Sequence, residues 1–431
     1  MALAVWGLAQ IGPFGMARAQ AFFETPAIYA AFLNLLLVPA MAAVLLGKRS
    51  VALVAVATAL AAAIFAAQSR GGLLALSVGL GFAGILAERA QLLRARPIGV
   101  ALALLAAGWL AATALRALPV PEAQTAPGAT ALAESSRSRF ELYALSWDAW
   151  RERPLVGTGY LTFRYVLEQG RTKAPSYGDA NETWFVHNDY LQSLQELGPL
   201  GLLAFLGLTL LPPLFGWRSL PSLAEGQRLS TAASAAALAT MSVHALVDFP
   251  FHVPACLLLY GALLGGLERR LGGQATSAAW HPRPWLRALR AGALAISAVI
   301  LLRPLVAEAA AERGVRKSTA GEAQSAALWL GAAQRLDPGE WRYHWYAGQF
   351  WDAQAAQSGN REAARLAAKA YADGFAANSL EVRNLLGKIS VHRRHRGLLD
   401  SPADAHTLQD WLAQAESLAP LNPAVRREIA R

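Results

Sequence analysis

Residues 51–87 read VALVAVATALAAAIFAA, then QSR, then GGLLALSVGLGFAGILA, so that two apolar stretches of equal length flank three polar residues. A helix that crosses the hydrocarbon of a bilayer needs about 20 mostly apolar residues. We therefore expect 51–67 and 71–87 to be two membrane-spanning helices joined by a tight turn at 68–70. The same pattern recurs along the chain, and it predicts an all-α, polytopic membrane helix bundle.

The composition of the 431 residues agrees with this prediction. Apolar residues make up 55% of the chain and charged residues only 16%, whereas about 25% is usual in soluble proteins. Residues 1–17 are apolar but interrupted by Gly12-Pro13, and we interpret them as the end of a further helix. The single cysteine, Cys256, excludes an intrachain disulfide. Eight spans are expected, at 27–46, 51–67, 71–87, 98–115, 197–217, 229–247, 250–267 and 288–307.

Lysine and arginine are distributed unevenly between alternate loops. One set of loops, at 48–49, 89–96, 218–228 and 269–290, holds 12 of these residues, whereas the short loops 68–70 and 248–249 hold only Arg70. Basic loops stay in the cytoplasm. The turn at 68–70, the long loop 116–196, the turn at 248–250 and everything after 307 are thus expected on the outer face. The net charge of +10 then orients the protein and does not indicate nucleic-acid binding.

The polar tail, 308–431, is expected to form a second domain after a membrane domain at 1–307. Leu336-Asp337-Pro338, Ala377-Asn378-Ser379 and Leu418-Ala419-Pro420 recur at a spacing of 41 residues, each after an alanine-rich stretch. This pattern indicates helical repeats of the tetratricopeptide type. An ordinary small helical bundle is the alternative. Either structure would serve as a docking surface for a protein partner.

Two arginines of the outer segments are candidates for binding an anion. Ser138 and Glu141 fit a capping box, which would place Arg139 in the first turn of a helix, where free N–H groups favour phosphate. The aromatic residues at 140, 143, 147 and 150 fall on one face of this helix and suit either a membrane interface or packing on the bundle. Arg70 precedes Gly71-Gly72, which permit close approach of a ligand. Ordinary surface or interfacial arginines are the alternative.

A histidine and an aspartate are further candidates for the site. His187 precedes 188–192, where a helix is expected to begin with Asp189 and Gln192 at a cap-like spacing. Histidine is the side chain best suited to accept a proton near neutral pH, although a lone histidine is more often structural. Asp248 lies at the third outer turn between His244 and His252, and it can pair with one of the arginines.

The order of these motifs resembles the O-antigen ligase family over roughly residues 10–267. The resemblance rests on Ser69-Arg70-Gly71-Gly72, on Arg139 followed by PLVGTGY at 154–160, on HNDYLQSLQELG at 187–198, and on VDFPF at 247–251. Family members include lipopolysaccharide ligases, polysaccharide polymerases and bacterial O-oligosaccharyltransferases. They usually have ten to twelve spans, so we expect N-terminal helices to be missing here.

The resemblance implies a glycosyltransferase of the bacterial inner membrane that needs no cofactor. It implies transfer of a glycan from undecaprenyl diphosphate to an acceptor hydroxyl at the periplasmic face, with Arg70, Arg139 and His187 as the essential residues. Neighbouring residues are then expected to contact the substrates, namely Ser69, Gly71, Gly159, Asn188, Glu196 and Asp248. Direct displacement by the acceptor would invert the anomeric centre.

The acceptor and the class of protein remain open at this stage. Lipid A core would make the protein a ligase, a growing chain a polymerase, and a Ser or Thr side chain a protein O-oligosaccharyltransferase. A different class is a non-enzymatic scaffold whose tail recruits cell-envelope partners, or a carrier of lipid-linked sugar. A carrier would place polar residues near the middle of the bilayer, but here they gather at the outer ends of the spans.

The outer segments contain no HExxH, paired cysteines or Asp-x-Asp motif, so metal-independent chemistry is expected. Transfer by the purified protein should continue after treatment with EDTA, as followed by the amount of glycosylated acceptor. A strict requirement for added metal would contradict this expectation.

Overall fold

The computed structural model describes residues 1–11, 14, 16–45, 50–92, 95–117, 129–175, 183–272 and 284–431. All regular structure within these ranges is helical, which confirms the all-α prediction. The chain divides into two compact units, Met1–Arg164 with Asn181–Ala279, and Tyr165–Ala180 with Trp280–Arg431. Gly12-Pro13, the expected break in the first apolar stretch, lies outside the described residues.

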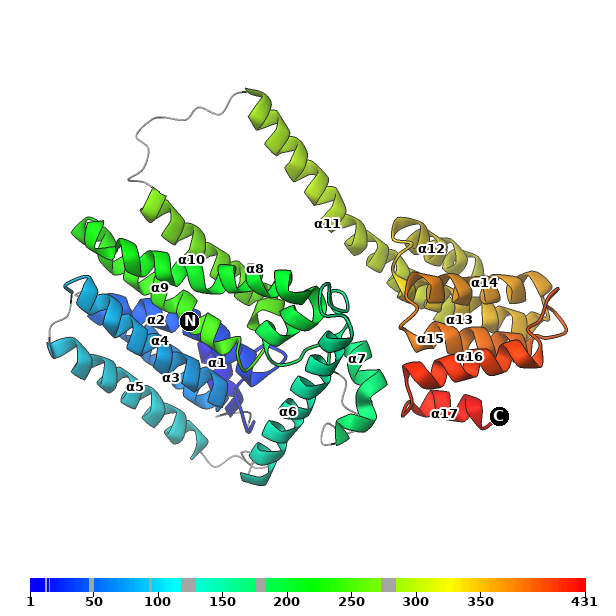
Figure 1. Ribbon diagram of the computed structural model, residues 1–431, viewed down its shortest axis with the longest axis horizontal. Coiled ribbons are helices and arrows are strands. Elements are labelled where there is room, and N and C mark those ends of the chain that lie inside the picture. The colour runs from blue at the N-terminus through cyan, green and yellow to red at the C-terminus, as the bar shows by residue number, and fades with distance from the viewer. Residues whose placement is uncertain are drawn as a thin grey trace. The chain divides into compact units, whose positions relative to one another are not determined.

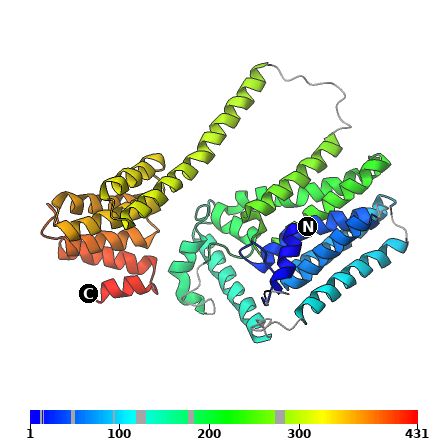
Figure 2. The ribbon, with the colours of Figure 1, turned by 180° about the vertical axis from the view of Figure 1, so that it is seen from behind.

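The first unit is a bundle of long helices that run side by side (Figures 1 and 2). Helix α2 packs against α3, α4, α9 and α10, and α4 and α8 pack on α9. The bounds are α1 (Ala2–Ile11), α2 (Pro26–Leu45), α3 (Val51–Ala67), α4 (Arg70–Arg89), α5 (Ala95–Arg116), α6 (Ala129–Glu152), α8 (Asp189–Ser219), α9 (Glu225–His244) and α10 (Pro254–Gly272), with the 3₁₀ turns η3 (Leu220–Ser222) and η4 (Pro250–His252) between them. Helix α7 (Phe163–Gly170) begins in the first unit, but most of it belongs to the second unit, as does the 3₁₀ turn η1 (Arg171–Lys173).

Helix α2 lies at the centre of this bundle because it is apolar on every side. Leu33, Leu37 and Met41 are fully buried and belong to the main core. The exception is Asn34, a buried amide whose Nδ2 donates to the carbonyl of Gly72 at 2.9 Å. A buried polar group must find a partner, so this bond fixes the first turn of α4 against α2.

Each of the eight predicted spans coincides largely with a helix. Three helices of the described chain are long and apolar enough to cross a bilayer, namely Pro26–Val44, Arg70–Arg89 and Asp189–Ser222. This supports a helical membrane protein, while the expected number of eight crossings stays a prediction. The expected boundary at 307 and 308 falls inside one continuous helix, α11 (Pro284–Thr319).

After α11, the described part of the second unit continues with helices α12 to α17, and the turns between them repeat. Helices α12, α14 and α16 end before Asp337, Asn378 and Ala419, which have closely similar backbone angles, with φ of −141°, −147° and −151°. Three residues after each of these, a side chain caps the next helix. The 41-residue period is therefore also a structural period, and the tetratricopeptide assignment stays a prediction. The bounds are α12 (Ala323–Leu336), α13 (Trp341–Ser358), α14 (Arg361–Ala377), α15 (Val382–Arg394), α16 (Ala405–Leu418) and α17 (Pro423–Ile429).

The contact between α4 and α9 provides a test of this packing. A Cβ atom on Gly79 would overlap the side chain of Thr240, whereas a Cβ on Gly84 of the same helix meets no described atom within 4 Å. We expect Gly79→Val to lower the free energy of unfolding by about 1–3 kcal/mol, the usual cost of overpacking, and Gly84→Val to have little effect. Thermal unfolding in detergent measures both, and equal melting temperatures would contradict the packing of α4 on α9.

Candidate active site

Three segments that are distant in the sequence meet at the carboxylate of Asp248. This residue follows α9 and is only 1% exposed. Its Oδ1 lies 3.0 Å from Nδ1 of His187, and its Oδ2 lies 3.9 Å from Nη2 of Arg139. Arg139 also donates through Nη1 to the carbonyl of Val247 at 3.0 Å. The structure thus brings two of the three predicted essential residues to one acidic group.

The contacts of His187 define which ring nitrogen is available for chemistry. A carboxylate only accepts hydrogen bonds, so Nδ1 of His187 is the donor and Nε2 carries the lone pair of the neutral ring. The backbone of His187 has a φ of +61°, an uncommon conformation for a residue with a side chain. The hydroxyl of Tyr143 donates to the carbonyl of His187 at 2.9 Å and so helps to hold the ring in place. This arrangement suits a general base.

Asp248 remains charged despite its burial. Burial acts to raise the pKa of this carboxyl group, but the hydrogen bond from His187 and the positive charge of Arg139 outweigh it. The pKa of Asp248 is therefore lower than its ordinary value of 3.8. A buried carboxylate with such partners can orient His187 and stabilise the imidazolium ion that forms when the ring takes a proton.

The expected position of Arg139 at a helix N-terminus is wrong. Helix α6 begins at Ala129, so Arg139 lies in the middle of the helix and no free N–H groups surround it. The preceding residues 129–136 are ATALAESS. Alanine is the best helix former, so these residues extend the helix from Ser138 toward the N-terminus. On this helix Leu142 and Leu145 are buried, whereas Phe140 and Trp147 are 69% and 47% exposed.

The turn between α3 and α4 places Arg70 at the same end of the bundle. Gln68 adopts a left-handed conformation, and Ser69 caps α4 by accepting the N–H of Gly72 at 3.0 Å. A Cβ on Gly71 would lie 2.8 Å from Cγ2 of Val247, so the first turn of α4 passes directly beside the residue that precedes Asp248. Arg70 is exposed at this turn.

A second histidine–aspartate pair joins the segment of His187 to the segment of Asp248. Here the aspartate lies on the first segment and the histidine on the second. Asp189 is fully buried, and its Oδ1 lies 2.7 Å from Nδ1 of His252, while its Oδ2 accepts the N–H of Phe251 at 3.0 Å. The expectation that Asp189 caps the helix is therefore wrong. Asn188 is the N-cap of α8 and accepts the N–H of Leu191 at 3.0 Å. This leaves the carboxylate of Asp189 available for His252.

The loop at 154–159 packs on a kink in α8. Gly198 has φ +68° and ψ −169°, and a side chain there would collide with the carbonyl of Leu155. Pro199 lacks an N–H, so the carbonyl of Gln195 loses its helical donor. The N–H of Thr158 takes that role at 2.9 Å, which attaches the loop to the helix.

Glu196 and Gly159 belong to this attachment. The N–H of Gly159 donates to the carbonyl of Glu196 at 2.9 Å, with φ of +109° at the glycine. The buried side chain of Glu196 accepts the N–H of Leu161 at 2.9 Å and Nε2 of Gln192 at 3.0 Å. The described contacts of Glu196 thus stabilise the loop, and its predicted contact with substrate stays a prediction.

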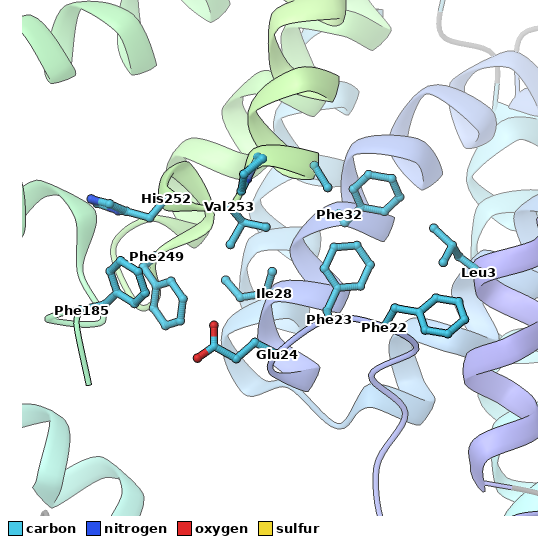
Figure 3. A pocket seen from close by; sticks show the side chains of 12 residues that line it. Leu3, Phe22, Phe23, Glu24, Ile28, Phe32, Phe185, Phe249, His252 and Val253 are labelled. Carbon is cyan, nitrogen blue, oxygen red and sulfur yellow. The ribbon is translucent and has the colours of Figure 1, made fainter. Parts of the chain in front are cut away.

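An apolar pocket of about 440 Å³ adjoins the site. Figure 3 shows Phe185 and Phe249 on one side of it and Phe22, Phe23 and Phe32 on the other. The ring of Phe249 lies edge-on to that of His187, with 5.0 Å between their centroids, so one aromatic residue connects the pocket with the candidate base. The lining is largely hydrocarbon and suits an apolar group.

Sequence reasoning missed several members of this site. It placed Asp248 beside an arginine but did not pair it with His187, and it did not pair Asp189 with His252. It also missed Arg18 and Arg116, whose guanidinium groups bind the last carbonyls of α3. A histidine and an aspartate 61 residues apart give no spacing signal. The placement of basic residues at the outer ends of apolar stretches was the one signal that could have identified Arg116.

Long apolar helices and a purely helical described structure define an all-α membrane protein. Residues 53–206 match the sequence model of a family described as O-Antigen ligase, and this match supports the O-antigen ligase family for this part of the chain. The family consists of bacterial inner-membrane proteins, and the match supports a membrane glycosyltransferase activity of the ligase or polymerase type. Among curated proteins, none matches the chain.

Replacing Asp248 by asparagine tests the central contact. Because the pKa of Asp248 is lowered by folding, its charge contributes stability above its unfolded value near pH 4, and this contribution is lost as the pH falls through the lower folded value. We expect Asp248→Asn to be less stable than the wild type at pH 7 and the difference to shrink below about pH 4. Melting temperatures across this range measure it, and a difference independent of pH would contradict the role of the charge.

Proposed function

We propose that the protein transfers a glycan from undecaprenyl diphosphate to an acceptor hydroxyl at the periplasmic face of the bacterial inner membrane. The observation that carries this proposal is the meeting of His187 and Arg139 at Asp248, with the turn of Arg70 beside them. A base and positively charged groups at one place are what this reaction requires. A scaffold would not require His187 to be bound by a buried carboxylate.

His187 is the proposed general base. The acceptor oxygen attacks the anomeric carbon of the glycan and loses its proton to Nε2 of His187, while the bond between this carbon and the phosphate oxygen breaks. Asp248 stabilises the resulting imidazolium ion. Attack opposite to the leaving group inverts the anomeric centre.

Arg70 and Arg139 are proposed to bind the diphosphate. When the bond between the anomeric carbon and the phosphate oxygen breaks, the lipid diphosphate departs and keeps the electron pair of this bond on its oxygen. Guanidinium groups stabilise such charge by bidentate hydrogen bonds. Arg139 is suited to this role because it is 31% exposed, and its bonds to Val247 and Asp248 fix its orientation.

The surroundings support a donor that is attached to a lipid. The apolar pocket beside Phe249 offers room for hydrocarbon next to the base, as an isoprenoid chain requires. The distribution of lysine and arginine in the loops supports the periplasmic location of the site and of the helical repeats in the second unit. The repeats are proposed to bind a protein partner.

The acceptor defines three forms of this proposal. Lipid A core is our first choice, which makes the protein a lipopolysaccharide ligase. A growing glycan chain or a protein hydroxyl would make it a polymerase or an O-oligosaccharyltransferase. A gene deletion distinguishes them by the loss of capped lipopolysaccharide, long chains or glycoprotein.

Alanine substitutions test the proposed roles. We expect Arg70→Ala, Arg139→Ala and His187→Ala each to reduce transfer at least about 100-fold, the usual effect of removing a general base or a charge-stabilising donor. The assay is glycan transfer by the purified protein, reconstituted with undecaprenyl-diphosphate glycan and candidate acceptors.

Arg137→Ala is the matched control. Arg137 lies on α6 two residues from Arg139, is 75% exposed and pairs with Glu141. It should transfer normally, and all four variants should insert into the membrane. Normal product with the three site variants would contradict the proposal.

A further inference from the structure

Two arginines that the proposed reaction does not yet use lie at the C-terminal end of α3. Arg18 donates through Nε to the carbonyl of Ala67 at 3.0 Å and through Nη2 to that of Gln68 at 3.1 Å. Arg116, at the end of α5, donates through Nη2 to the carbonyl of Ala66 at 2.7 Å. The C-terminus of a helix carries partial negative charge, so these carbonyls favour the binding of cationic side chains.

The same turn leads directly to the candidate active site. Gln68 ends α3, Ser69 caps α4, and Arg70 is the first residue of α4. The amide oxygen of Gln68, in the orientation that satisfies its contacts, accepts from Nη1 of Arg116 at 2.5 Å. Arg18 and Arg116 are therefore attached to the segment that presents Arg70.

The arrangement gathers positive charge at one place. The positive charges of Arg116, Arg70 and Arg139 act on Arg18, and the negative charge of Asp248 acts on it in the opposite direction. Burial is the largest cause that lowers the pKa of Arg18, and the other three arginines lower it further, while Asp248 raises it. Like charges held together are unfavourable, and an anion among them removes this cost.

Binding helix carbonyls alone does not explain this gathering. Side chains that bind the carbonyls at the end of α3 do not need to lie near Arg139. Nε of Arg116 is buried and has no hydrogen-bond partner among the described residues, so this guanidinium group is not fully used by the protein. Both side chains are partly exposed and keep further N–H donors for a ligand.

We propose that Arg18 and Arg116 are donor-binding residues, which together with Arg70 and Arg139 hold both phosphates of the polyprenyl diphosphate. This inference rests on the proposed function. Four guanidinium groups match a diphosphate better than a monophosphate, because the diphosphate carries more charge and more acceptor oxygens. The α3–α4 turn then serves as a rigid support on which three of the four arginines are placed.

The test measures binding of undecaprenyl diphosphate and undecaprenyl monophosphate to the full chain in one detergent. We expect the wild type to prefer the diphosphate. Arg18→Gln and Arg116→Gln should each weaken diphosphate binding about 10-fold or more, the usual effect of losing a charge-assisted hydrogen bond, and should reduce the preference over the monophosphate. A purely structural role would lower the melting temperature without changing this preference.

Conservative and control variants keep the test decisive if the glutamine variants fold poorly. Arg18→Lys keeps the charge but not the bidentate geometry, and it should bind with intermediate affinity. Arg137→Gln should bind as the wild type does. A wild type that binds the diphosphate and transfers glycan, with Arg18 and Arg116 variants of unchanged preference, would overturn the inference and leave the proposed function intact.

Two further ligands separate the sources of the anion. Inorganic diphosphate should compete with the lipid diphosphate, since both offer the same phosphate groups. Phosphatidylglycerol should compete weakly, and equally strong competition by it would overturn the inference in favour of a general site for anionic lipid. A wild type that neither binds the lipid diphosphate nor transfers glycan would overturn the proposed function together with the inference.

Discussion

A charged carboxylate buried at the end of a helix bundle must be compensated, and Asp248 is compensated by two side chains from distant parts of the chain. An unpaired buried charge costs several kcal/mol, so the fold depends on bringing α6 and the start of α8 to the turn after α9. The same contacts fix the ring of His187 and the guanidinium group of Arg139. Stability and chemistry therefore have one origin here, because the partners that keep Asp248 charged are the groups proposed to act on the substrate.

The two histidine–aspartate pairs are reciprocal. His187 and Asp189 stand two residues apart on one segment, and Asp248 and His252 four apart on the other, with each histidine bound to the opposite aspartate. Such crossed pairs resist both sliding and separation of the segments. The N–H of Asp189 adds a third link by donating to the carbonyl of Ala245 at 2.8 Å. The start of α8 is in consequence held from several directions, and the positive φ of His187 can be maintained.

The sequence predicts the helical segments well, because an apolar segment that crosses a bilayer must satisfy its own backbone hydrogen bonds and does so as a helix. Their ends are less predictable. Ser138 and Glu141 satisfy the capping pattern, yet the alanine-rich residues before them prolong α6, and Asn188 competes successfully with Asp189 for the cap of α8. Local patterns cannot decide such cases, since the choice depends on which carboxylate a distant histidine requires. The order of motifs indicated Arg70, Arg139 and His187. Arg18 was not indicated, because it lies in none of these motifs.

The equal turns of the second unit have a consequence for how this region can vary. Each of the residues 337, 378 and 419 resets the chain into the same conformation before the next helix begins, and helices α13 to α17 pack on their neighbours in the series. Duplication or loss of one 41-residue block would join compatible ends and preserve the contacts of the remaining pairs. The tail can thus lengthen or shorten in whole steps during evolution, changing the area available to the proposed partner while the residues around Asp248 stay as they are.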